Sequence, residues 1–253
     1  MHGSRLLALL SCCSLLACGS FTDQSARSRS AILTDDAKLR VAEAADVGGD
    51  GDLALSMYVA AAQNAPTDVP LQLRCADALA RRGHYGEAKQ LLTDRLKTNP
   101  RQPELTRGLA LVYLISGDPR HAIEMLDQIL ATRPDDAAAL TDKGIAMDLL
   151  QRHAEAQALY RQALATSPND PAINNDLALS MMLEGRTREA QQILEPFKGA
   201  AAPRRLTTNL GILLAANGRM EQARPLVDGQ VSNDELQTIA KALGRGTAQA
   251  ATP

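Results

Sequence analysis

Small and apolar positions along this chain recur with a period of about 34 residues, which predicts a series of helix pairs. In each period a small residue stands where two helices must touch, and a second follows twelve positions later. The first set is Ala42, Ala76, Ala110, Gly144, Ala178 and Gly211, and the second set is Ala54, Ala88, Ala122, Ala156, Ala190 and Ala223. Aromatic residues are few, with no Trp, two Phe and four Tyr, so aliphatic side chains and alanine must fill the core.

Glycine and proline mark where the predicted helices end. A glycine follows the first small residue by seven positions in five periods, and Gln151 takes that place in the fourth. Proline follows the second small residue by twelve positions in four periods, and it stops the helix because it has no N–H to donate. The glycines are Gly49, Gly83, Gly117, Gly185 and Gly218, and the prolines are Pro66, Pro100, Pro134 and Pro168.

This pattern resembles the tetratricopeptide repeat (TPR) family over residues 35–228. The resemblance implies an all-α fold, a right-handed α-solenoid of about six helix-turn-helix repeats, and a surface that binds peptides or proteins. Pro196 should shorten the second helix of the fifth repeat, and Pro225 should kink the second helix of the sixth. The expected repeats are 35–68, 69–102, 103–136, 137–170, 171–203 and 204–228.

The segment after the repeats predicts one closing helix. Ser232 and Glu235 form a capping box ahead of an amphipathic stretch, so we expect a capping helix over residues 232–243. A terminal repeat needs such a cover because its outer face has no neighbour. Residues 244–253 are expected to form a disordered tail.

The amino terminus predicts export and a lipid anchor. Arg5 precedes the apolar stretch Leu6 to Leu16, which has the length of a secretory signal core and is too short to span a bilayer. The stretch ends in a segment that resembles the lipobox of bacterial lipoproteins, with Cys18 as the lipidated residue. We therefore expect a signal peptide over residues 1–17, followed by a lipidated cysteine and flexible tether over residues 18–34.

The lipobox resemblance also implies a location. Gly19 follows Cys18, and the sorting rule of Gram-negative lipoproteins then favours the outer membrane, with the protein facing the periplasm. An ordinary secreted protein or an inner-membrane protein is the alternative. A solvated spacer is the preferred interpretation of the tether, and contact of its two arginines with anionic headgroups is the alternative.

A candidate partner groove lies on the first helices of repeats three to six. Repeats one and two place charged residues on this face, whereas the later repeats place apolar ones there with a polar edge. Such a strip suits an amphipathic helix or an extended apolar segment, unless curvature of the array buries it. The groove residues are Leu111, Leu114, Ile115, Ile145, Leu149, Asn175, Leu179, Met182, Leu183, Asn209 and Ile212.

Polar residues in the same repeats resemble the ladder with which some TPR proteins hold a ligand main chain. The ladder positions hold Asp142, Asp176 and Asn209. An ionised aspartate accepts from a backbone amide but cannot donate to a carbonyl, so a two-sided clamp is not expected. Paired basic residues that clamp a terminal carboxylate do not repeat along the chain.

Other chemistry finds little support in the sequence. The four histidines are scattered, no metal spacing or nucleophile motif is present, and a net charge of −2 without a basic face argues against nucleic acid. Cys75 occupies an apolar helix position, so a buried structural thiol is expected, with a reactive thiol as the alternative. We predict a protein with no catalytic residues, cofactor or metal.

Lipobox, tether, repeats and closing helix together resemble the TadD lipoprotein family of the tight-adherence (Flp) pilus assembly machinery. The resemblance implies a scaffold or a secretin pilotin-like factor, with a secretin or other pilus-assembly subunits as partners. Other outer-membrane TPR lipoproteins are the alternative within this class, namely a type IV pilus pilotin or an adaptor for peptidoglycan hydrolases. A periplasmic enzyme or its regulatory subunit is the alternative from another class.

Overall fold

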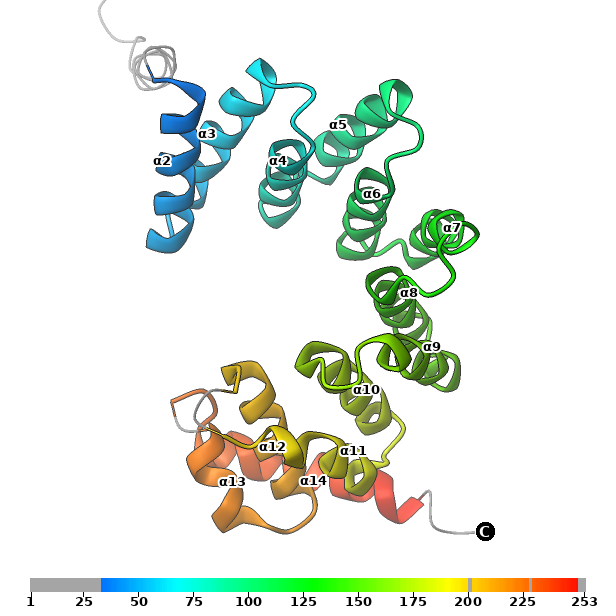
Figure 1. Ribbon diagram of the computed structural model, residues 1–253. Helices are drawn as coiled ribbons and strands as arrows, with labels where there is room; N and C mark the ends of the chain where they lie inside the picture. The colour runs from blue at the N-terminus through cyan, green and yellow to red at the C-terminus, as the bar shows by residue number, and fades with distance from the viewer. Residues whose placement is uncertain (1–32, 200–201, 228, 250–253) are drawn as a thin grey trace, which may run out of the picture. The chain divides into compact units, whose positions relative to one another are not determined.

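The computed structural model describes residues 33–199, 202–227 and 229–249 (Figure 1). Within these ranges the chain holds thirteen α-helices, one short 3₁₀ helix and no strand. None of the described helices has both the length and the apolar character needed to cross a membrane. The predicted signal peptide, Cys18 and most of the predicted tether lie outside the described residues.

The chain divides into two compact units, residues 1–71 and 72–253. The first unit contains helices α2 (Asp35–Gly48) and α3 (Gly51–Asn64), which pack against each other. Buried Ala42, Ala54 and Ala61 fill the contact between them. Side-chain bonds also join the helices, among them those from Tyr58 Oη to Asp46 (3.2 Å) and from Asn64 Nδ2 to Asp35 (2.7 Å).

The second unit consists of successive helix pairs and a closing helix. Within it, α5 contacts α6, α7 contacts α8, α9 contacts α10 and α11 contacts α12, while α6, α8, α10 and α12 contact one another in turn. The fold is therefore an α-solenoid of helix pairs. The helices are α4 (Val69–Arg81), α5 (Tyr85–Thr98), α6 (Pro103–Ile115), α7 (Pro119–Leu130), α8 (Ala137–Leu149), α9 (His153–Thr166), α10 (Pro171–Leu183), α11 (Thr187–Leu194), α12 (Arg204–Ala216), α13 (Met220–Val227) and α14 (Asn233–Gln249).

The small residues of the 34-residue pattern lie between the two helices of each pair. All ten alanines of that pattern are at most 1% exposed, and both glycines are buried. The glycines are required by their neighbours: a Cβ on Gly144 would lie 2.5 Å from the Tyr160 ring, and a Cβ on Gly211 would lie 2.5 Å from Val227 Cγ1. Helices can approach this closely only because no side chain stands between their backbones.

The turn residue after each first helix adopts the left-handed conformation. The five predicted glycines have φ values of 77° to 81°, and Gln151 adopts φ 60° in the fourth repeat. Glutamine therefore takes a backbone conformation that its Cβ disfavours. The turn geometry of the repeat is kept at this position against the preference of the side chain.

The second helix of repeat five is short, as predicted from Pro196, whereas the kink predicted at Pro225 stays a prediction. Helix α11 has eight residues and passes into the 3₁₀ helix η1 (Glu195–Phe197), which contains Pro196. Helix α13 continues through Pro225 to Val227.

The closing helix α14 packs on α12, with Leu236 fully buried. Its capping box is formed as predicted: Ser232 N donates to Glu235 Oε2 (2.9 Å), and Glu235 N donates to Ser232 Oγ (3.3 Å). The expectation of disorder from residue 244 is wrong for residues 244–249, which continue the helix. A single glycine costs a helix only about 1 kcal/mol, so Gly244 alone does not end it.

We predict that Gln151→Gly stabilises the protein. Glycine removes the cost of the left-handed conformation, about 1–2 kcal/mol, from the folded state. It also raises the conformational entropy of the unfolded chain, which offsets part of this gain, so the free energy of unfolding should rise by about 0.5–1 kcal/mol. Urea denaturation followed by circular dichroism measures the change. The reciprocal variant Gly117→Ala, at φ 79°, should lose a similar amount, and a loss of stability in Gln151→Gly would contradict the interpretation.

We predict that Gly144→Ala destabilises the protein by about 1–3 kcal/mol, because the added methyl group overlaps the Tyr160 ring in a packed core. Gly86→Ala is the matched control. Gly86 is also helical, but apart from its chain neighbours and its own helix backbone no heavy atom lies within 4 Å of the place its methyl group would take, so its replacement should be neutral or slightly stabilising. Equal effects of the two substitutions in urea denaturation would show that close packing at Gly144 is not the cause.

Candidate protein-interaction site

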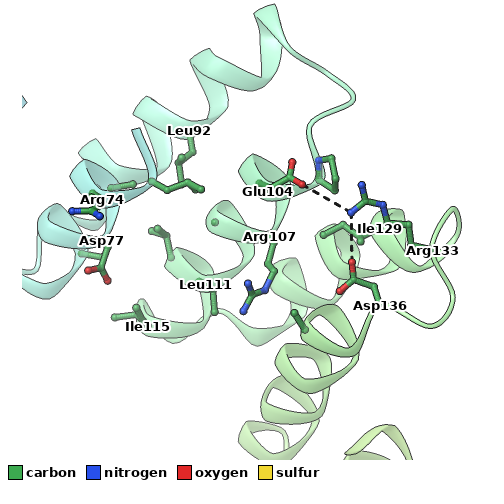
Figure 2. A pocket seen from close by; sticks show the side chains of 17 residues that line it. Arg74, Asp77, Leu92, Glu104, Arg107, Leu111, Ile115, Ile129, Arg133 and Asp136 are labelled. Atoms are coloured by element: carbon green, nitrogen blue, oxygen red, sulfur yellow. Dashed lines mark ion pairs between the residues drawn. The ribbon is translucent and has the colours of Figure 1, made fainter. Parts of the chain in front are cut away.

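The main candidate site is a cleft of about 500 Å³ in the second unit (Figure 2). It is built by the first helices of repeats two to four, by α5, and by the end of α7 with the turn that follows it. Its floor is apolar and includes Leu92, Val112 and Ile129, each at most 4% exposed. Charged side chains surround this floor. They are Arg74, Asp77, Glu104, Arg107, Arg133 and Asp136.

Two small residues line the cleft at positions where the next repeat carries a larger one. Gly108 lines the cleft at the repeat position that holds Asp142, Asp176 and Asn209 further along the chain. A Cβ on Gly108 would lie 2.3 Å from Leu73 Cδ2, so any side chain there would displace the cleft wall. Ala80 is small at a second lining position, where the next repeat has Leu114.

The cleft overlaps only the start of the groove predicted from the sequence. Leu111 and Ile115 line the cleft, and the remaining predicted groove residues do not. Among those, Leu149 and Leu183 are 55% and 60% exposed, similar to Ile115 at 50%. The structure thus contains a cleft in repeats two to four, followed by exposed aliphatic side chains at matching positions on α8 and α10.

Several predicted groove residues are not available as surface. Leu114 is 8% exposed because it packs in the core with Ala110 and Leu126, and Asn175 is 4% exposed. These two assignments to a partner surface are therefore wrong. The half-buried members of the predicted groove are Leu111, Ile145, Leu179, Met182, Asn209 and Ile212.

The predicted polar ladder is bonded within the protein. Arg107 Nε donates to Asp142 Oδ2 (2.6 Å), a carboxylate that is 7% exposed. Asn209 Nδ2 donates to Asn175 Oδ1 (2.7 Å), and Asn175 Nδ2 donates to Asp176 Oδ1 (3.3 Å). These groups connect neighbouring first helices, so their polar atoms are engaged in stacking the repeats.

Burial raises the pKa of both ladder carboxyls, Asp142 and Asp176. Desolvation raises the pKa of Asp142, and the Arg107 guanidinium opposes this only in part. Desolvation likewise raises the pKa of Asp176, with the charges of Asp142 and Asp148 adding to the effect. A buried carboxylate beside other carboxylates favours its neutral form.

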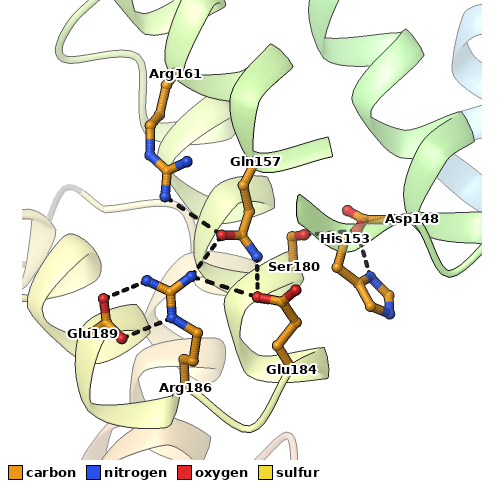
Figure 3. Close-up of polar contacts among 8 residues, drawn as sticks. All are labelled: Asp148, His153, Gln157, Arg161, Ser180, Glu184, Arg186 and Glu189. Atoms are coloured by element: carbon orange, nitrogen blue, oxygen red, sulfur yellow. Dashed lines mark hydrogen bonds and ion pairs between the residues drawn. The ribbon is translucent and has the colours of Figure 1, made fainter. Parts of the chain in front are cut away.

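A histidine, an aspartate and a serine lie together in repeats four and five, although no catalytic triad results (Figure 3). His153 Nδ1 lies 2.8 Å from Asp148 Oδ1, and Ser180 Oγ donates to the same oxygen (2.7 Å). Tyr160 Oη donates to Asp148 Oδ2 (2.9 Å). The serine is fully buried and bonds the aspartate instead of the histidine, so it is not placed as a nucleophile activated by a base.

A second polar network joins the same repeats around Gln157, which is 2% exposed (Figure 3). Gln157 Nε2 donates to Glu184 Oε2 (2.8 Å), and its Oε1 accepts from Arg186 Nη1 (2.9 Å). Arg186 also forms a two-pronged ion pair with Glu189. The sequence pattern gave no sign of this network, because Gln157 is 27 and 29 residues from Glu184 and Arg186 and only folding brings it to them.

The remaining candidates for chemistry are structural. Cys75 is 2% exposed, and burial raises the pKa of its thiol to about 11, which disfavours the reactive thiolate. Over the described residues, no group of three or more His, Cys, Asp or Glu side chains is arranged to hold a metal ion.

Family comparisons match most of the repeat region. Tetratricopeptide repeat profiles match residues 48–112, 81–143 and 149–204, then 116–171, and finally 204–228. The chain belongs to the tetratricopeptide repeat family. Proteins of this family are in general non-catalytic scaffolds for protein–protein interaction.

Solved TPR structures share the fold at low sequence identity. A thermophilic TPR protein in Thermus thermophilus aligns with a TM-score of 0.62 and 21% identity, covering 72% of this chain and 99% of that one. A TPR protein from Parabacteroides merdae aligns with a TM-score of 0.65 and 16% identity, covering 88% and 89%. PilW, a widely conserved type IV pilus biogenesis factor, aligns with a TM-score of 0.63 and 20% identity, covering 81% and 97%.

One curated relative is similar over part of the chain. It is the uncharacterized protein y4yS of Sinorhizobium fredii (strain NBRC 101917 / NGR234), 34% identical over 74 residues. The match covers 29% of this chain and 41% of that protein, so the chain spans about two fifths of the length of the curated relative it matches.

We predict that Asp176→Asn stabilises the protein at neutral pH. Because burial raises the pKa of Asp176, the folded chain binds more protons than the unfolded chain between the ordinary and the raised value, and stability falls as pH rises through that window. The variant has no ionisable carboxyl group at this position, so its stability does not fall with pH for this reason. Its free energy of unfolding should exceed that of the natural chain at pH 7, and the difference should shrink toward pH 4.

Glu235→Gln provides a comparison, because the pKa of Glu235 is lowered whereas that of Asp176 is raised. Hydrogen bonds from Ser232 lower the pKa of Glu235, so its contribution to stability is present at neutral pH and is lost as pH falls. The glutamine variant should be less stable than the natural chain at pH 7, again converging at low pH. Urea denaturation across this range measures both, and a pH-independent difference for Asp176→Asn would contradict the assignment.

Proposed function

We propose that this protein is a non-catalytic scaffold that holds a segment of a partner protein in the cleft of repeats two to four. The observation that carries the proposal is a cleft of about 500 Å³ that has an apolar floor and is surrounded by charged side chains. Such a combination buries apolar side chains of a ligand while polar groups fix its orientation. The exposed aliphatic residues Leu149 on α8 and Leu183 on α10 lie outside the cleft and are not part of the proposed site.

We further propose that the scaffold works in a bacterial envelope as a lipoprotein attached through Cys18. The lipobox-like segment and the polar stretch after it support an anchor and a tether, and Gly19 favours the outer membrane in a Gram-negative cell. Repeats on a tether would meet their partner in the periplasm, close to the membrane.

The proposed pathway is assembly of a tight-adherence (Flp) pilus, with a secretin or another assembly subunit as the partner. Its support is the resemblance to the TadD family along the chain. The likeness to PilW supports a common architecture only. A type IV pilus pilotin or an adaptor for peptidoglycan hydrolases is the alternative, because the same scaffold can present either partner.

A comparative pull-down tests the cleft and the pathway together. The mature protein is used as bait on detergent-solubilised envelopes of a bacterium that assembles Flp pili, and bound proteins are identified by mass spectrometry. The variant carries Leu111→Asp and Ile115→Asp, which place charge on the cleft wall. We expect the natural protein to recover a secretin or another pilus-assembly subunit and the variant to lose about tenfold or more of it, since burying an unpaired charge costs several kcal/mol.

The matched control carries Leu149→Asp and Leu183→Asp, two exposed aliphatic residues that do not line the cleft. It should retain the partner if the cleft is the site, whereas loss in both variants would favour the longer groove. Circular dichroism must show that each variant is folded. Recovery of peptidoglycan hydrolases would favour the adaptor function over the role in pilus assembly. The lipid anchor is tested separately: release of the full-length Cys18→Ser variant from the membrane would support it.

A further inference from the structure

The charged side chains around the cleft restrict the chemistry of its ligand, and Arg107 is the most informative of them. Arg107 projects from α6 between Arg74 and Arg133 in Figure 2, and its side chain is 42% exposed. Its Nε donates to the buried carboxylate of Asp142. Across the described residues Arg107 makes no second side-chain hydrogen bond, so the N–H groups on both Nη atoms are open to a ligand.

Arg133 adds further donors on one side of the cleft. Its Nη1 lies 4.0 Å from Glu104 and 3.7 Å from Asp136, distances typical of loose ion pairs and too long for hydrogen bonds. Within the described part of the chain its guanidinium has no hydrogen-bond acceptor. Two guanidinium groups with open N–H donors therefore border an apolar floor.

A carboxylate satisfies such donors best. Arginine presents a planar fork that pairs with the two oxygens of a carboxylate, and these charge-assisted bonds are about twice as strong as neutral ones. Asp142 fixes the Arg107 guanidinium through Nε, so the fork is oriented before a ligand arrives. The apolar floor beside it accommodates a bulky aliphatic or aromatic side chain.

The acidic groups of the cleft indicate where along the ligand this carboxylate lies. Asp77 lies beside Arg74 on one side of the cleft, and Glu104 and Asp136 flank Arg133 on the other, while Arg107 lies between them (Figure 2). An anionic chain end near either side would meet these carboxylates. The carboxylate beside Arg107, that of Asp142, is buried and does not line the cleft, so the middle of the cleft is the position that favours a negative charge on the ligand.

We infer that the cleft recognises an internal segment of a partner protein in which a Glu or Asp side chain stands next to bulky apolar residues. The carboxylate pairs with Arg107, the neighbouring apolar side chains pack on Leu111 and Ile115 above the buried floor, and the segment continues past Arg74 and Arg133. This inference rests on the proposed function and specifies the chemistry of the segment that the cleft holds.

Fluorescent peptides capped at both ends test this chemistry directly. The probe has the core Leu-Glu-Phe between flexible Gly-Ser flanks, and matched peptides replace Glu by Gln or by Lys, or both apolar residues by Ser. A further peptide, with Leu-Phe and a free terminal carboxylate, represents a chain end. Fluorescence anisotropy with the mature protein measures each dissociation constant at low and high salt.

We expect the Glu peptide to bind about tenfold more tightly than the Gln peptide, corresponding to a charge-assisted pair, and the Lys peptide to bind more weakly still. In Arg107→Gln this preference should disappear. Because that substitution leaves Asp142 buried without its partner, the double variant Arg107→Gln, Asp142→Asn is measured beside it. Arg152→Gln, at an exposed arginine of the α8–α9 turn, should keep the full preference.

Each other outcome overturns the inference in a recognisable way. Equal binding of the Glu and Gln peptides would show that the cleft does not recognise a carboxylate and binds the apolar side chains alone. Tightest binding of the chain-end peptide would replace the internal segment by a terminus. Absence of binding by every peptide would reject the inference, and the cleft variants in the envelope pull-down would still decide the proposed function independently.

Discussion

The close approach of two helices through small residues is the contact on which the rest of this structure depends. Fully buried alanines separate the helices of each pair, and at Gly144 even a methyl group would overlap the Tyr160 ring. Because these positions set the spacing of the backbones, they also determine which face of each first helix points into the core. The opposite face is thereby presented at the same register in every repeat, where it is free to vary.

Variation of these outward residues accounts for the presence of the cleft in only one part of the array. The packing positions are alike from repeat to repeat, whereas the outward positions carry charges, polar groups or aliphatic side chains. Ala80 and Gly108 line the cleft in repeats two and three, and Asp142 occupies the position equivalent to Gly108 one repeat later. The site is thus a local variation on a constant scaffold.

This division also accounts for what the sequence could predict. Helix pairs, turns, the short α11 and the Ser232–Glu235 capping box all depend on residues close in sequence, and their local signals were sufficient. The cleft, the Asp148 contacts and the Gln157 network join side chains that come from different helices and their connecting turns. Such contacts depend on helix packing and on side-chain rotamers. Residue types were therefore enough to predict that the first helices carry an apolar face, but not that Leu114 and Asn175 on this face are buried.

The Arg107–Asp142 pair connects the site to the stacking of the repeats. Arg107 lies on α6 and Asp142 on α8, so the guanidinium that borders the cleft also joins two successive repeats. A ligand that bonds the Nη groups stabilises the side-chain orientation in which Nε reaches Asp142. By thermodynamic linkage, a repeat contact strengthened by the ligand must in turn strengthen binding of the ligand. Recognition in this cleft and cohesion of repeats three and four are therefore expected to depend on one another.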